Sequence, residues 1–262
     1  MGGNPVMLTL VWLCLFAALA GFIDSIGGGG GLVQLPALLV LRSDIAEVAP
    51  ALLFGTNKLA AVTGTTAAAV AYNRRVQIDW RLVWPAMITA AIFSMLGARV
   101  AILLSPAVLR PLVLVLLIGV AIYTFCRKTF GTAARETRAS ARPTPYVLAI
   151  GAAIGFYDGF FGPGTGSFLM FLFVGVLGLD FLHASSSAKI INVTTNLAAL
   201  VYFAWAGQLI YSIAIPMGIC NVLGGVVGSR MAIRRGSGFV RAVFLIVVIG
   251  VIIRYAYEVI VA

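Results

Sequence analysis

The sequence has 262 residues, of which 61% are hydrophobic and 10% charged, and its mean hydropathy is +1.08. A soluble domain is about 45–50% apolar and about 25% charged, so this composition excludes an ordinary soluble protein and indicates a protein embedded in a membrane. The net charge of +10 does not predict nucleic-acid binding, because the arginines gather in short loops between apolar segments, as membrane topology alone requires.

Apolar segments follow one another along the chain in two groups. About twenty apolar residues span a bilayer as a helix, and the shorter segments flank glycine-rich breaks. We expect an all-α polytopic membrane protein of eight to ten helices, and whether the short segments span the membrane or re-enter it stays open. The segments are 5–26, 32–41, 46–72, 80–104 and 106–126 in the first group, and 146–161, 167–179, 182–205, 209–232 and 238–261 in the second.

Glycine-rich breaks interrupt both groups near their start. The first is the run Gly27–Gly31, and the second is the degenerate copy Gly162-Pro163-Gly164-Thr165-Gly166. Glycine is about 1 kcal/mol less favourable than alanine inside a helix, so each run predicts a helix end within the membrane. In hydrocarbon, a broken backbone survives only where protein buries it or where it lines a wet cavity. Matching breaks in two halves are typical of solute transporters.

The two groups of segments align with each other, which predicts an internal duplication. We expect an N-terminal repeat at 1–126, a cytoplasmic linker at 127–145 and a C-terminal repeat at 146–262. Shared membrane composition would match leucine and alanine, whereas polar and special residues match here in one register. The aligned pairs are Lys58 with Lys189, Gln77 with Gln208, Pro85 with Pro216, Gly97 with Gly228, Arg99 with Arg230 and Arg110 with Arg241.

The basic residues predict how the chain crosses the membrane. Counting spans outward from a cytoplasmic linker places Arg74–Arg75 and Arg234–Arg235 inside and the uncharged turn 206–208 outside. The equivalent turns of the two halves then face opposite sides, which predicts inverted repeats with both termini outside, in the plasma membrane. The linker is placed inside because of its basic residues Arg127, Lys128, Arg135, Arg138 and Arg142.

Lys58 is the most informative side chain, because it lies midway along its apolar segment. A cation at that depth costs at least ~2.5–3.5 kcal/mol, so something must compensate for it. Either it forms an internal ion pair with Asp24 or Asp158, or it attracts an anionic substrate. Lys189 aligns with Lys58 but lies nearer a helix end, so reaching out to the interface is a further alternative for it.

Asp24 and Asp158 directly precede the two breaks. One interpretation is that they cap helices or pair with the lysines, and the other is that they are proton-coupling carboxylates. Both interpretations stay open.

Helices that begin after the breaks, near Leu32 and Ser167, would direct free N–H groups and positive dipole ends toward the middle of the membrane, where they bind anions. Glycine also lets a ligand approach the backbone closely. For the polar side chains nearby, hydrogen bonding between helices is the alternative to ligand binding. The predicted substrate-binding residues are Gly28, Gly29, Gly30, Gly31, Asn57, Lys58, Gly162, Gly164, Thr165, Gly166, Lys189 and Asn192, with Asp24 and Asp158 as coupling candidates.

Other kinds of site are not indicated. Cys14, Cys126 and Cys220 lie apart in apolar segments, without the spacing of a metal site or a disulfide framework. The motifs of serine hydrolases, zinc proteases and P-loop NTPases are missing. We therefore expect a protein that is not an enzyme, with no metal, no cofactor and no nucleic-acid partner.

Two sets of paired motifs span most of the chain. The first half contains Gly-Phe-Ile-Asp-Ser-Ile-Gly-Gly-Gly-Gly-Gly at 21–31 with Pro36, and Gly-Thr-Asn-Lys at 55–58. The second half contains Gly-Phe-Tyr-Asp-Gly-Phe-Phe-Gly-Pro-Gly-Thr-Gly at 155–166 and Ser-Ala-Lys at 187–189. Through these motifs the sequence resembles the sulfite exporter TauE/SafE family of membrane permeases.

The resemblance implies export of sulfite, or of a small organosulfonate anion such as sulfoacetate, driven by the proton gradient. It carries binding roles only to the glycines and lysines of the matching motifs. The competing functions are an anion channel, a permease for another small anion such as a carboxylate, and a membrane subunit that transports nothing. The particular anion, the direction of transport, the coupling ion and the oligomeric state stay open.

Overall fold

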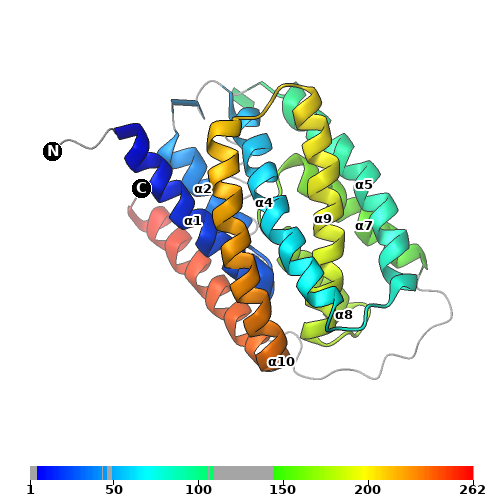
Figure 1. Cartoon of the computed structure of the whole chain (residues 1–262). Coiled ribbons are helices and arrows are strands. Elements are labelled where there is room, and N and C mark those ends of the chain that lie inside the picture. Colours follow the sequence, from blue (N-terminus) through cyan, green and yellow to red (C-terminus); the bar gives the residue numbers. More distant parts are fainter. Residues whose placement is uncertain (1–4, 43, 46–48, 106, 109–143, 262) are drawn as a thin grey trace.

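The computed structural model describes residues 5–42, 44–45, 49–105, 107–108 and 144–261, and these residues are helical with short connections (Figure 1). The predicted linker up to residue 143, and nearly all of the predicted segment 106–126, lie outside the described residues. The helices are α1 (Pro5–Gly27), α2 (Gly31–Leu41), α4 (Pro50–Asn73), α5 (Trp80–Leu103), α7 (Thr144–Phe160), α8 (Thr165–Gly175), α9 (Phe181–Trp205) and α10 (Tyr211–Val261).

The helices next to the glycine-rich runs end because the backbone turns there. Between α1 and α2, Gly28 and Gly29 have positive φ angles of 74° and 88°. Between α7 and α8, Gly162 and Gly164 have φ angles of 97° and 83°. Only glycine adopts this left-handed region without strain, so each run can end one helix and start the next within a few residues.

Helix α10 consists of two arms, which correspond to the segments 209–232 and 238–261. The arms meet at Gly236, whose φ of 71° and ψ of −169° are not helical. In Figure 1 the orange arm descends and the red arm returns, so the start of α1 and the end of α10 both lie at the left of the view.

Long helices of one half pack against helices of the other half: α1 lies along α10, and α5 lies along α7. Glycines permit the close approach. A Cβ at Gly224 of α10 would lie 2.8 Å from the backbone nitrogen of Phe22, and a Cβ at Gly97 of α5 would lie 2.7 Å from that of Phe160. Small residues let membrane helices approach in this way. In the alignment of the two halves, α1 corresponds to α7 and α5 corresponds to the first arm of α10. The contact of α1 with α10 is therefore equivalent to the contact of α7 with α5. The inverted orientation of the two halves stays a prediction.

The distribution of side chains is that of a membrane protein, with apolar groups outside and polar groups inside. Trp84, Val201 and Leu223 are 56%, 60% and 62% exposed, whereas Lys58 and Thr195 are 2% and 0% exposed. By length and composition, three of the described helices could cross a membrane: Met7–Gly27, Trp80–Leu103 and Tyr211–Gly236. Helices α2 and α8 are shorter and apolar. The predicted all-α polytopic membrane protein is confirmed.

Candidate functional site

The two glycine-rich breaks contact each other inside the bundle. A Cβ at Gly28 would lie 2.8 Å from the Cα of Gly166, and a Cβ at Gly31 would lie 3.1 Å from the Cα of Pro163. The hydroxyl of Ser167 donates a hydrogen bond to the carbonyl of Gly27 at 3.2 Å. A side chain at position 28 would therefore collide with the backbone of the opposite half.

A cavity opens beside these breaks and draws its wall from both halves. The volume that water can occupy inside it is about 30 Å³, room for about two water molecules, since one needs roughly 10–15 Å³ by this measure. Glycine backbone and short polar side chains make most of the wall. The lining residues are Ala20, Asp24, Gly29, Gly30, Gly31, Gln34, Asn57, Lys58, Ala61, Thr65, Asp158, Gly162, Gly164, Thr165, Gly166, Asn192, Asn196 and Asn221.

Lys58 forms an ion pair in the wall of this cavity. Its Nζ lies 2.9 Å from Oδ2 of Asp158, and the two side chains are 3% and 2% exposed. Of the two carboxylates considered as its partner, the structure selects Asp158. Because Lys58 belongs to α4 and Asp158 to α7, the pair joins the two halves of the chain.

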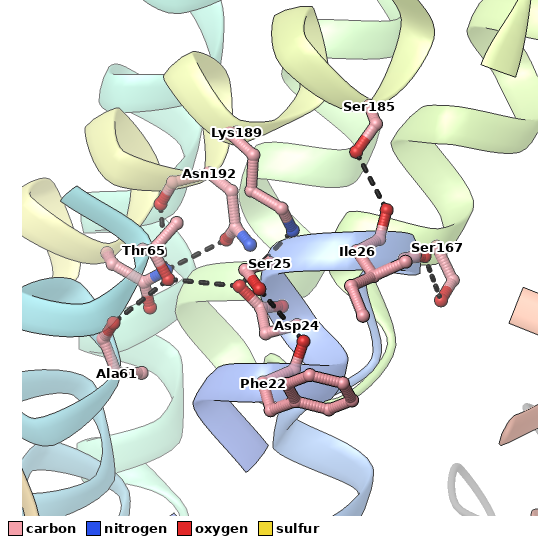
Figure 2. Close-up of polar contacts among 12 residues, drawn as sticks. Phe22, Asp24, Ser25, Ile26, Ala61, Thr65, Ser167, Ser185, Lys189 and Asn192 are labelled. Carbon is pink, nitrogen blue, oxygen red and sulfur yellow. Dashed lines mark hydrogen bonds and ion pairs between the residues drawn. The ribbon is translucent and has the colours of Figure 1, made fainter. Parts of the chain in front are cut away.

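Lys189 forms the corresponding pair with the other aspartate (Figure 2). Its Nζ lies 3.2 Å from Oδ2 of Asp24, and the lysine side chain is 1% exposed. The same carboxylate oxygen accepts a hydrogen bond from the Thr65 hydroxyl at 3.2 Å. The alternative that Lys189 reaches out to the interface is wrong, because its carboxylate partner lies inside the bundle.

Several backbone N–H groups around the cavity have no hydrogen-bond acceptor among the described residues. The first bonds of α2 run from the N–H of Leu32 to the carbonyl of Gly29 and from that of Val33 to the carbonyl of Gly30, at 2.9 and 3.0 Å. No described residue accepts a hydrogen bond from the N–H of Gly30, Gly31 or Gly166, and all three residues line the cavity. The starts of α2 and α8 thus offer donors and positive dipole ends to the same small space.

Side-chain amides complete the wall. The Asn221 Nδ2 donates to Oε1 of Gln34 at 2.5 Å, and the Gln34 Nε2 donates to the carbonyl of Asn57 at 3.4 Å. The Oδ1 of Asn57 is buried and has no hydrogen-bond partner among the described residues. A buried polar atom of this kind normally has a partner, so its position calls for a donor from water or a bound molecule.

Most of the sequence-predicted residues lie at the cavity. Gly28 and Lys189 do not line it: Gly28 forms the crossing with Gly166, and Lys189 lies behind the wall at Asp24. The remaining predicted residues, including Asp24 and Asp158, do line it.

Gln34, Thr65 and Asn221 also line the cavity, although sequence reasoning did not select them. Each is a polar residue within an apolar segment, and that was the signal available, since polar groups at membrane depth face the protein interior.

No described group of histidine, cysteine, aspartate or glutamate side chains has an arrangement that could hold a metal ion. The described lining instead combines the Lys58 ammonium group and free N–H donors with the carboxylates of Asp24 and Asp158.

Comparison with known proteins gives a consistent result. The family model described as "Sulfite exporter TauE/SafE" matches residues 13–255. The chain is 36% identical over 245 residues to "Probable membrane transporter protein ORF9" of Sinorhizobium sp, covering 94% of this chain and 91% of that relative. It is 34% identical over 244 residues to "Probable membrane transporter protein YfcA" of Escherichia coli K12, covering 93% and 87%.

A third relative, "Probable membrane transporter protein" of Haemophilus influenzae, is 33% identical over 227 residues, covering 87% of this chain and 86% of the relative. No solved structure matches the chain. With the family model covering nearly its whole length, the chain belongs to the sulfite exporter TauE/SafE family of membrane transporters.

Proposed function

We propose that this transporter is a proton-coupled secondary exporter of sulfite or a small organosulfonate anion in the plasma membrane, and that the cavity beside the glycine-rich breaks is its substrate site. The observation that carries the proposal is the meeting of Lys58 with the free N–H groups of Gly30, Gly31 and Gly166 in one space. The TauE/SafE membership supports the choice of a sulfur anion.

The donor set fits the chemistry of such a substrate. Sulfite and sulfonates carry clustered anionic oxygens, which bind to backbone N–H groups and to cations. Glycine at these positions lets the anion reach the backbone, since it has no Cβ to cover the N–H group. The unpartnered Oδ1 of Asn57 can accept a hydrogen bond from the hydroxyl of a protonated oxyanion.

The ion pairs provide the coupling. In the structure Lys58 is neutralised by Asp158, and a substrate anion that binds Lys58 competes with that carboxylate. Protonation of Asp158 removes the competing charge and releases the ammonium group for the substrate. Binding of the anion and of a proton therefore favour each other, as the linkage of two sites requires.

The placement of the ion pairs between the halves supports alternating access. Lys58–Asp158 and Lys189–Asp24 each connect helices from different halves. A rocking motion that opens the cavity on one side has to separate charged groups buried in the bundle, and such a separation is costly unless a proton or substrate replaces the lost partner. The transporter therefore does not change conformation when neither substrate nor proton is bound.

Flux measurements in proteoliposomes test the proposal. Vesicles loaded with radiolabelled sulfite and given an outward proton gradient should release label through the wild-type protein, because an anion and a proton that favour each other's binding travel together. The rate should saturate with sulfite and fall when the gradient is collapsed. Flux that rises linearly without saturation and ignores the gradient would identify an anion channel. Saturable flux of acetate in place of sulfite would identify a carboxylate permease, and absence of any flux would leave a subunit that does not transport.

A further inference from the structure

A second hollow lies between α4 and the first arm of α10, and none of its lining residues belongs to the cavity described above. The volume that water can occupy inside it is about 540 Å³. We name it the arginine groove. It is lined by Ala67, Val70, Ala71, Arg74, Arg75, Val226, Arg230, Ile233 and Arg234.

The groove is apolar along its length and basic at one end. Helix α4 and the first arm of α10 run in the same direction in Figure 1, from the top of the view to the bend in α10. Along α4 the apolar positions 67, 70 and 71 precede Arg74 and Arg75, and along α10 Val226 precedes Arg230 and Arg234. The four guanidinium groups therefore lie toward the end of the bundle that carries the bend, and the apolar floor extends away from them.

Nothing within the described protein neutralises this cluster. Arg74, Arg75, Arg230 and Arg234 are exposed, and no described aspartate or glutamate forms an ion pair with them or lines the groove. Like charges gathered around one hollow repel each other, so an anion from outside the chain lowers their energy. Arginine binds phosphate through two parallel N–H donors.

The surroundings select a lipid over a soluble anion. The exposed side chains beside the groove are apolar: Val70 is 46% exposed, Val227 is 52% and Leu223 is 62%. In a membrane protein such a surface meets acyl chains. The positive-inside rule places the Arg74–Arg75 and Arg234–Arg235 ends in the cytoplasmic leaflet, where anionic lipids are concentrated and where basic pockets between helices bind their headgroups.

We propose that the arginine groove binds an anionic phospholipid, with the headgroup phosphate among the four arginines and an acyl chain along Ala67, Val70 and Val226. The lipid joins α4, which carries Lys58, to α10, which carries the cavity residue Asn221. This site is independent of the identity of the transported anion.

Native mass spectrometry of the purified protein tests the proposal. The protein, in detergent, is mixed with phosphatidylglycerol or with phosphatidylcholine of the same chain length. We expect wild-type protein to retain phosphatidylglycerol selectively, and Arg230→Gln/Arg234→Gln to retain about tenfold less, because each basic residue near an anionic headgroup contributes a severalfold gain in affinity. The matched control Arg99→Gln, an exposed arginine on α5 outside the groove, should bind as the wild type does.

Equal retention of the two lipids by the wild type, or unchanged retention of phosphatidylglycerol by the double variant, would overturn the proposal. If the double variant does not fold, Arg74→Gln/Arg75→Gln on the other wall provides the same comparison. Glycerol phosphate is added as a soluble competitor. We expect that glycerol phosphate does not displace the lipid. Displacement at equal concentration would show that the groove binds soluble anions and would refute the lipid assignment.

Discussion

Lys58 and Asp158 lie 2.9 Å apart in the bundle interior, one on α4 in the first half of the chain and the other on α7 in the second. Lys189 and Asp24 repeat the relationship with the halves exchanged, at 3.2 Å. Four ionisable groups at membrane depth are costly, and each is paired with a partner from the other half of the chain.

The first prediction concerns the stability of the Lys58–Asp158 pair. Lys58→Met should lower the free energy of unfolding by about 3–5 kcal/mol, because it leaves a buried carboxylate unpaired. The double variant Lys58→Met/Asp158→Leu should regain most of that loss, since two apolar side chains leave no buried charge. Thermal unfolding of the purified proteins measures both. A double variant as unstable as the sum of the single ones would show that the pair is not a unit.

The second prediction concerns protons. Sulfite binding to the wild type should strengthen as the pH falls, because protonated Asp158 no longer competes for Lys58. In Asp158→Asn the competing charge is permanently absent, so binding should be less dependent on pH and stronger than wild type at alkaline pH. Fluorescence titration with sulfite at several pH values measures this. An Asp158→Asn variant with the pH profile of the wild type would remove Asp158 from the coupling.

The third prediction separates backbone strain from contact between the halves. Gly28 and Gly207 have φ angles of 74° and 70°, but a Cβ at Gly28 would meet Gly166 and Ser167, whereas a Cβ at Gly207 would meet nothing within 4 Å. Gly207→Ala should cost roughly 1–2 kcal/mol, the price of left-handed backbone alone. Gly28→Ala should cost clearly more and abolish transport. Equal losses in thermal stability would show that the breaks do not contact each other.

The fourth prediction concerns orientation. Asn73 ends α4 directly before one of the two equivalent turns, and Gln208 lies in the other. The inverted-repeat hypothesis places the two residues on opposite sides of the membrane. In a variant with Cys14, Cys126 and Cys220 replaced by serine, a membrane-impermeant maleimide applied to intact cells should label Gln208→Cys and not Asn73→Cys. Labelling of both from the same side would contradict inverted repeats.

Much of the fold was predictable from the sequence because membrane helices follow simple rules. Apolar length and glycine-rich runs predicted where helices lie, and the observed starts of α2 at Gly31 and α8 at Thr165 are within two residues of the expected Leu32 and Ser167. The bend at Gly236 was visible as a gap between two apolar segments. Which helices pack together was not predictable, because both faces of such helices are apolar.

The sequence predicted the charged residues that line the cavity, but not all of its uncharged polar residues. A lysine at membrane depth requires a partner, so the aspartates were identified, but their crossed pairing depends on which helices meet. Gln34 and Asn221 join through a hydrogen bond between α2 and α10, helices far apart in the chain. No local pattern brings those two residues together, so only the structure places them at the cavity.

The central claim is that the cavity at Lys58 binds a small sulfur oxyanion, and a thermal-shift titration of purified protein tests it most directly. Sulfite, sulfate, thiosulfate, sulfoacetate and acetate are compared on the wild type, Lys58→Ala, Lys189→Ala and the control Arg99→Ala. The account predicts a saturable rise in melting temperature with sulfite or sulfoacetate for the wild type and Arg99→Ala, and loss of that rise in Lys58→Ala. Lys189→Ala should lose it as well, although Lys189 does not line the cavity, because the variant leaves the Asp24 carboxylate unpaired in the wall, where it repels the anion. A rise that survives in Lys58→Ala, or is the same for every anion tested, would contradict it.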